Sequence, residues 1–116
     1  MEITVARKRL EEMRDELDRS ILILHGEHPG PQAGVGYPQD SADAGASLSE
    51  ADRTEAVLIS ARAQREEVLA ALARIEDNTY GHCVDCGHQI PAGRLDARPE
   101  AARCVSCQSA YAKRRR

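Results

Sequence analysis

The chain is 116 residues long, carries a formal net charge of −3 at pH 7, and contains three Tyr but no Trp or Phe. This length suits one domain or a rod with a small appendage, and the scarcity of aromatic residues excludes a large aromatic core. Apolar residues of the Ala, Leu, Val and Ile types, with 30% charged residues, are more typical of long helices than of a β-sandwich or a Rossmann sheet. No apolar run approaches the ~18 residues that span a bilayer, and no signal peptide is recognised, so we expect a soluble cytoplasmic protein without a membrane partner.

Charge is distributed unevenly along the chain. Residues 94–116 hold seven basic and two acidic side chains, whereas residues 25–50 hold four acidic side chains and no Lys or Arg. The sequence therefore predicts a basic C-terminal end and an acidic middle. The weakly acidic total argues against a protein that binds nucleic acid over its whole surface.

A first helix is predicted over residues 2–24. Apolar or small residues recur there at steps of three and four, as in a coiled-coil seam, at Ile3, Ala6, Leu10, Met13, Leu17, Ser20 and Leu24. Ser20 is the weak point of this stripe, with Ile21 beside it as an alternative contact. Gly26 is expected to end the helix, because glycine readily adopts the left-handed conformation of a C-terminal cap.

Residues 25–47 are predicted to form a loop, because five Gly and three Pro fall in this stretch. Connections between helices are usually about two to eight residues long, so a loop of this length is either functional or disordered.

A second helix is predicted over residues 48–78. Ser47 and Glu50 have the spacing of a capping box at its start, and neither Gly nor Pro interrupts it. Its stripe mirrors that of the first helix, at Ala51, Leu58, Ala61, Arg65, Val68, Leu72 and Ile75. Arg65 places a charge in the stripe, and we expect its guanidinium to reach a Glu at the rim.

These two helices are expected to pack against each other. Neither stripe is buried by its own helix, and isolated helices of this kind are marginally stable in water. The predicted fold is therefore mainly α: an antiparallel coiled-coil helical hairpin over residues 1–78, then a small module over residues 79–116 that ends in a short helix over residues 105–114.

All four cysteines lie in two Cys-x2-Cys steps, Cys83 with Cys86 and Cys104 with Cys107, separated by 17 residues. This spacing is typical of a structural zinc site, in which four thiolates surround the ion and leave no open position for catalysis. Two disulfides and a redox dithiol are the alternatives. The expected reducing compartment argues against the first, and the absence of a βαβ pattern argues against the second. One structural Zn2+ per chain is predicted.

His82 and His88 flank the first cysteine step and are alternative ligands, but a complete set of four thiolates favours their being surface polar residues. The apolar residues of this module, among them Ile90 and Leu95, are too few for a free-standing core. The metal is therefore expected to hold the module together.

The run ALARIEDNTYGHC at residues 71–83 closely resembles the DksA/TraR family of bacterial zinc-finger proteins. The same holds for Ile90-Pro91, for RLDARP at residues 94–99 and for CVSCQ at residues 104–108. The resemblance is sharp over residues 71–108 and architectural over the helical hairpin.

This resemblance implies a transcription regulator that binds RNA polymerase rather than DNA. In the family, a coiled-coil hairpin enters the secondary channel of the polymerase, and acidic residues at its tip approach the catalytic Mg2+. The family's tip pattern is two Asp three apart with a small residue two positions later, and Asp40, Asp43 and Gly45 match it. Without the family, these carboxylates would be interpreted as residues that keep a loop solvated.

The resemblance also bears on nucleotide binding. In members that respond to guanosine tetraphosphate, basic residues near the finger hold the phosphates. Arg98 is retained here, but Glu67 and Gln108 occupy two of these positions. A carboxylate repels phosphate at close range, so we do not expect guanosine tetraphosphate as a partner. Arg94 and Arg98 are kept as candidate basic contacts.

Two other functions stay open. A DNA-binding zinc module would use Arg94, Arg98, Arg103 and the basic cluster at residues 113–116, but the sequence lacks a two-Cys, two-His layout and an evident recognition helix, so no specific DNA site is expected. A zinc–thiolate redox sensor would release its metal when the cysteines are oxidised. We expect no enzyme, since there is no open metal site, nucleophile–base pair or phosphate-binding glycine loop, and we expect a monomer.

Overall fold

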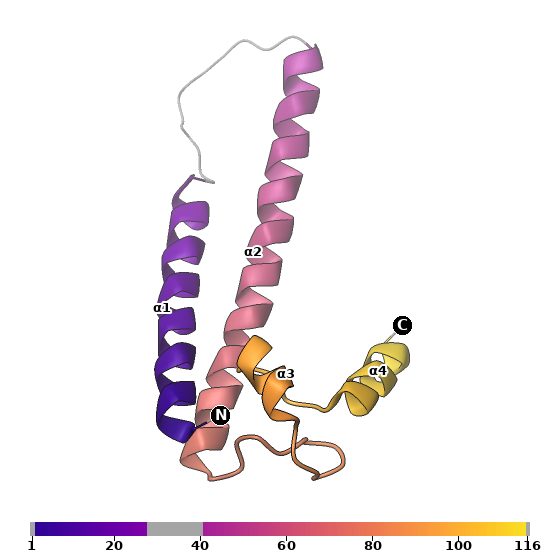
Figure 1. Cartoon of the computed structure of the whole chain (residues 1–116). Coiled ribbons are helices and arrows are strands. Elements are labelled where there is room, and N and C mark those ends of the chain that lie inside the picture. Colours follow the sequence, from indigo (N-terminus) through magenta and orange to yellow (C-terminus); the bar gives the residue numbers. More distant parts are fainter. Residues whose placement is uncertain (1, 28–40, 116) are drawn as a thin grey trace. The chain divides into compact units, whose positions relative to one another are not determined.

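The computed structural model describes residues 2–27 and 41–115, with side chains for residues 2–25 and 49–115. Four helices account for most of these residues: α1 (Ile3–Glu27), α2 (Ser41–Glu76), α3 (Ala92–Ala97) and α4 (Val105–Arg114). Among the described residues, the β pairing is limited to one isolated antiparallel bridge between His82 and Gln89. The mainly helical fold predicted from the sequence is confirmed (Figure 1).

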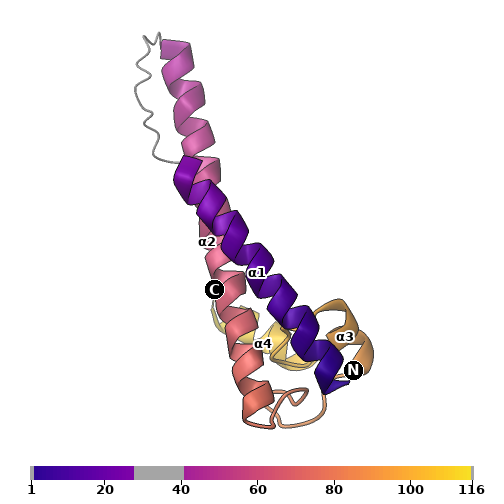
Figure 2. The same cartoon turned by 90° about the vertical axis from the view of Figure 1, so that its left-hand side faces the viewer.

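Two compact units divide the chain, one made of Met1–Arg14 with Glu66–Arg116 and the other of Asp15–Arg65. Each unit contains a stretch of α1 and a stretch of α2. Within each unit these two stretches lie antiparallel to one another, as the two views in Figures 1 and 2 show. The predicted antiparallel pairing of the two helices is thus present in both units.

The first unit has a core to which both long helices and the C-terminal segment contribute. Leu10 and Val68, one from each predicted stripe, are fully buried at 0% exposure. The other buried apolar side chains of this unit are Ala6, Ala71, Ile75, Tyr80, Ile90, Leu95, Pro99 and Ala101. Arg9 of α1 donates a hydrogen bond of 2.8 Å to the backbone oxygen of Asp96 in α3. The start of α1 therefore packs on the C-terminal segment as well as on α2.

The second unit has fewer buried side chains among those that the structure describes. Its described apolar residues that are buried or half-buried are Leu17, Ile21, Leu24, Leu58 and Ala61. Ser20 is exposed while Ile21 is half-buried, so the alternative contact predicted beside Ser20 is the one formed. Arg65 forms an ion pair with Asp18 of the facing helix. The partner expected for Arg65, a Glu at the rim, was therefore wrong.

Both long helices extend beyond their predicted boundaries. α1 continues to Glu27, so Gly26 does not end it, and α2 begins at Ser41 rather than at residue 48. The serine–glutamate pattern at residues 47–50 consequently lies inside α2 and is not its N-terminal cap.

The early start of α2 has a simple explanation in residue type. Alanine has the highest helix propensity and occupies every second position from Ala42 to Ala46. The single Gly45 in this stretch costs only about 1 kcal/mol relative to alanine. The loop predicted over residues 25–47 is therefore shorter at both ends, and residues 28–40 lie outside the described part of the chain.

The end of α2 at Glu76 is fixed by a Schellman-type cap, two residues before the predicted end. Asn78 adopts a φ of 61°, the left-handed conformation that such a cap requires. The N–H of Thr79 donates to the carbonyl of Arg74 at 2.8 Å, and the N–H of Asn78 donates to the carbonyl of Ile75 at 3.2 Å. Asparagine tolerates this conformation better than other non-glycine residues, so the sequence stops the helix here.

Candidate metal centre

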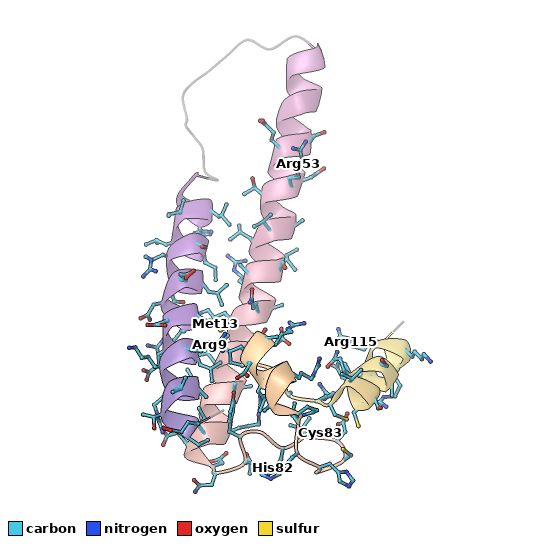
Figure 3. All side chains as sticks on the ribbon, viewed as in Figure 1. Arg9, Met13, Arg53, His82, Cys83 and Arg115 are labelled. Atoms are coloured by element: carbon cyan, nitrogen blue, oxygen red, sulfur yellow. The ribbon has the colours of Figure 1, made fainter. Side chains whose placement is uncertain are left out.

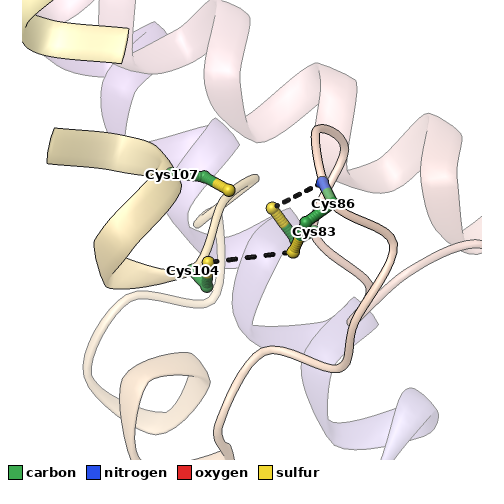
Figure 4. A group of neighbouring side chains, drawn as sticks. All are labelled: Cys83, Cys86, Cys104 and Cys107. Carbon is green, nitrogen blue, oxygen red and sulfur yellow. Dashed lines mark hydrogen bonds between the residues drawn. The ribbon is translucent and has the colours of Figure 1, made fainter. Parts of the chain in front are cut away.

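The four cysteines of the chain converge on one point of the first unit (Figure 4). Their Sγ atoms all lie within 4.8 Å of one another. The Sγ atoms of Cys86 and Cys104 are 4.0 Å apart. A zinc ion with four tetrahedral Zn–S bonds of about 2.3 Å separates its sulfurs by about 3.8 Å. The cluster therefore has the dimensions of a four-thiolate zinc site.

A tight turn positions the first two sulfurs. Gly87 has a φ of 79°, which disfavours other residue types, and its N–H donates to the carbonyl of Cys83 at 2.9 Å. The N–H of Cys86 points at the Cys83 Sγ at 3.5 Å. The N–H of Cys83 in turn donates to the carbonyl of His88 at 2.8 Å. This backbone network turns both sulfurs toward the same side.

The second two sulfurs lie at the start of α4. Cys104 is the N-cap residue of this helix, and Cys107 lies three residues further on. A spacing of three places both residues on one face of the helix start. The N–H of Val84 donates to the carbonyl of Ala102 at 2.9 Å, which joins the first cysteine step to the segment that leads into the second.

The ionisation of the thiols supports a cation at this position. The backbone N–H of Cys86 lowers the pKa of Cys83 to about 6. Hydrogen bonds with the thiols of Cys104 and Cys83 raise the pKa of Cys107 to about 12. Four thiols this close cannot all ionise by themselves, because each thiolate repels the next. A bound divalent cation offsets that repulsion and displaces the protons, so the donor set fits Zn2+.

Neither His82 nor His88 joins the cluster. Among the described residues, the four cysteines form the one group of three or more Cys, His, Asp or Glu side chains close enough to hold a metal. His82 and His88 are both exposed. The donor set is therefore complete with sulfur and leaves no coordination position for a substrate.

A polar and aromatic bridge supports the cluster, and sequence analysis missed it. Arg103 donates to Asp85 at 2.8 Å, and its guanidinium carbon lies 3.8 Å from the centre of the Tyr111 ring. Asp85 lies between two cysteines, whereas Tyr111 lies on α4. Cation–π contacts of this kind stabilise by about 0.5–2 kcal/mol. The spacing of Asp85, Arg103 and Tyr111 along the chain forms no recognisable pattern, so only the folded structure shows that these three residues are in contact.

A second set of contacts joins the segment from Pro99 to Ala101 to the end of α2 and the turn that follows it. The hydroxyl of Tyr80 donates to the carbonyl of Pro99 at 2.9 Å in a buried position. Burial raises the pKa of the Tyr80 phenol. The half-buried Arg74 reaches the carbonyl of Ala101 at 3.4 Å, and burial lowers the pKa of its guanidinium. These side-chain contacts to backbone carbonyls fix the segment from Pro99 to Ala101 against the end of α2.

The candidate basic contacts Arg94 and Arg98 lie together on the wall of a pocket of about 100 Å3. Glu67, Arg103 and Gln108 also line it. Arg94 donates through Nε to the carbonyl of Arg103 at 2.8 Å, so part of its donor capacity is used within the protein. The structure thus brings together the two arginines and the two residues, Glu67 and Gln108, that were expected to disfavour phosphate.

The predicted acidic tip falls only partly within the described residues. Asp40 lies outside them. Asp43 and Gly45 lie in the first turns of α2 and not in a loop, but their side chains are outside the described set.

Comparison with known proteins places these features in context. Residues 78–113 match the family of prokaryotic dksA/traR C4-type zinc fingers. The RNA polymerase-binding transcription factor DksA of Escherichia coli (strain K12) is 26% identical over 98 residues, which are 84% of this chain and 60% of that protein. The protein of the same name from Caulobacter vibrioides (strain NA1000 / CB15N) is 44% identical over 46 residues, 40% of this chain and 32% of that protein. The chain thus spans less than two thirds of either relative.

A solved structure resembles nearly the whole chain. Transcription factor DksA2 from Pseudomonas aeruginosa matches with a TM-score of 0.78 and 26% sequence identity, over 97% of this chain and 84% of that one. The helical hairpin followed by a four-cysteine module is therefore a DksA2-like fold. Every helix within the described residues is too short or too polar to cross a membrane.

Proposed function

Because the chain belongs to the DksA/TraR family of C4-type zinc-finger proteins, we propose that it binds RNA polymerase and regulates transcription. The observation that carries this proposal is that sequence and fold match the same kind of protein. The four-cysteine finger at residues 78–113 matches in sequence, and the fold of 97% of the chain is shared with transcription factor DksA2. The relatives from E. coli and C. vibrioides are named RNA polymerase-binding transcription factors.

The zinc site has a structural role in this proposal. Zn2+ held by Cys83, Cys86, Cys104 and Cys107 cross-links the segment before α3 to the start of α4. The module is oriented on the end of α2 by Arg74 and Tyr80, which donate to backbone carbonyls of the segment from Pro99 to Ala101. With four thiolate ligands the site performs no reaction, so the function lies in binding a partner.

The helical hairpin is proposed to enter the secondary channel of the polymerase. Asp43 first, and Asp40 second, would bring carboxylates toward the catalytic Mg2+, for which oxygen ligands are preferred. The start of α2 at Ser41 supports this role for Asp43, because a residue in a first helical turn has a fixed backbone and an acidic side chain is favoured there by the helix dipole. Gly45 lies two residues further along α2.

The proposal does not include guanosine tetraphosphate. Arg94 and Arg98 share their pocket with Glu67, whose carboxylate opposes a polyphosphate at close range. We therefore propose that the hairpin and the finger bind RNA polymerase without a nucleotide.

The experiment that tests this function is the substitution Asp43→Asn. It removes one negative charge without changing side-chain size, so we expect affinity for RNA polymerase to change by less than about twofold. The effect on transcription initiation should fall by roughly tenfold or more, as expected for a charge that acts at the catalytic centre and not in binding. Both quantities are measured with purified polymerase, as a dissociation constant and as initiation on a responsive promoter.

Asp52→Asn is the matched control. It makes the same change on the same helix at an exposed position, and it should leave both quantities at the wild-type level. If Asp43→Asn and Asp52→Asn behave alike, or if Asp43→Asn loses binding and regulation in equal measure, the separate role of residue 43 is refuted.

A further inference from the structure

A small polar pocket lies in the first unit, where α2, α3 and α4 each contribute to its wall through Glu67, Arg94 and Gln108. Its volume is about 100 Å3, roughly the share of three water molecules in the liquid. The small side chains of Ala101 and Ala102 also line it. Pockets for drug-sized molecules are about 300–1,000 Å3, so this one has room only for a molecule of a few non-hydrogen atoms.

The arginines around this pocket are held in place by contacts within the protein. Arg94 donates through Nε to the carbonyl of Arg103 at 2.8 Å. Arg98 donates through Nε and Nη2 to Oε2 of Glu100, a residue only 3% exposed, at 3.3 Å and 3.2 Å. The Nε of Arg103 donates to Asp85 at 2.8 Å. Groups that are fixed before binding lose less conformational entropy when a ligand arrives.

Most of the charge in the pocket wall is already balanced. Two of its three arginines form ion pairs with the carboxylates of Glu100 and Asp85. Among the described residues, neither Arg94 nor Glu67 forms an ion pair, and the two do not pair with one another although they line the same pocket. The three arginines are thus matched by three carboxylates, which leaves no net charge to attract a polyanion. What remains is one free guanidinium end and one free carboxylate.

These two free charges indicate the chemistry of a ligand. The terminal nitrogens of a guanidinium hold a carboxylate in a bidentate geometry. A glutamate carboxylate accepts hydrogen bonds from an ammonium group. The side-chain amide of Gln108 has no partner among the described residues, so it adds a donor and an acceptor to the wall. A molecule with a carboxylate and an ammonium group close together satisfies both Arg94 and Glu67.

We propose that this pocket binds a small zwitterionic amino acid, of the size of glycine, alanine or serine. Arg94 holds its carboxylate, Glu67 holds its ammonium group, and the volume of the pocket excludes larger side chains. The binding requires no RNA polymerase. It can therefore be tested on the chain alone, and it stands or falls separately from the regulatory function proposed above.

The test is a titration of the zinc-loaded chain with L-alanine at neutral pH, followed by the backbone amide signals in NMR spectra. A ligand this small is expected to bind with a dissociation constant of about 1 mM. The amide signals of Ala101 and Ala102 should shift, because both residues line the pocket. Acetate and methylammonium each carry one of the two charges, and each should bind at least about tenfold more weakly than alanine.

Two substitutions separate the two contacts. Glu67 is exposed, so Glu67→Gln should leave folding intact, weaken alanine binding about tenfold and keep acetate binding within about twofold of wild type. Arg94→Gln removes the group that holds the carboxylate, so it should weaken the binding of both alanine and acetate about tenfold. Bound zinc is measured for each variant to verify that the finger is intact.

Glu66→Gln and Arg115→Gln are the matched controls. Glu66 is exposed and adjacent to Glu67 on α2, and Arg115 lies at the end of α4 (Figure 3). Neither residue lines the pocket. Both variants should bind alanine within about twofold of wild type. Losses equal to those of Glu67→Gln and Arg94→Gln would indicate a general charge effect and would overturn the proposal.

Three results with the wild-type chain would also overturn it. Alanine binding no tighter than acetate binding would show that Glu67 takes no part. Absence of any shift up to about 100 mM alanine, roughly a hundredfold above the expected dissociation constant, would show that the pocket wall is only a solvated group of charges. Inorganic pyrophosphate binding more tightly than alanine would assign the pocket to a phosphate ligand instead.

Discussion

Replacing Cys104 with Ser is expected to release the zinc and to unfold the module after α2. Structural zinc contributes about 10–16 kcal/mol of binding free energy to small metal-bound modules. The buried apolar side chains after α2 are few, with Ile90 and Leu95 among them, and α4 has none, so the remaining contacts cannot compensate. Bound zinc per chain, measured by elemental analysis, should fall from about one to near zero, and residues 79–115 should lose protection from proteolysis.

Ser106→Ala is the control for this experiment. Ser106 is exposed and lies between the two cysteines of the second step, so its hydroxyl can be removed without touching a ligand. This variant should keep one zinc and wild-type protease resistance. Retention of stoichiometric zinc by Cys104→Ser would show that Cys104 is not a ligand.

Leu10→Ala should be the most damaging single change within the helical part of the first unit. Leu10 is completely buried in the first unit, and removing a buried leucine side chain usually costs about 3–5 kcal/mol. Urea unfolding followed by the helical circular dichroism signal measures this loss. Leu22→Ala on the same helix is the control, because Leu22 is 72% exposed and its truncation should cost less than about 0.5 kcal/mol.

A result in which both leucine variants lose similar stability would contradict the packing of α1 on α2 described above. The comparison is informative because both residues belong to one helix and undergo one chemical change. Only their burial differs.

The parts of the fold that depend on local spacing were predictable from the sequence. Leu10 and Val68 belong to stripes with helical period, and both are buried. The two Cys-x2-Cys steps predicted a four-sulfur cluster, and Cys104 begins the helix expected at residues 105–114. The apolar stripes and the Cys-x2-Cys steps are both defined by residues three or four positions apart, and such short spacings can be read directly from a sequence.

The parts that depend on tertiary contacts were not predictable. The helix α3 has six residues and is stabilised by the burial of Leu95, for which no local pattern exists. The bridge from Asp85 through Arg103 to Tyr111 joins three separate segments. The start of α2 at Ser41 differs from the prediction for another reason. The capping-box spacing at residues 47–50 predicts a helix start there, whereas the helix propensity of the alanines before it favours an earlier start.

The most direct test of the central claim is a crosslinking measurement with purified core RNA polymerase. A photoreactive residue is placed at position 43, on the first turn of α2, and in a second protein at the exposed position of Ala110 on α4. We predict that both proteins form a complex and that position 43 alone gives adducts with polymerase segments bordering the catalytic centre. Absence of a complex, or adducts near that centre from position 110 but not from position 43, would contradict the account.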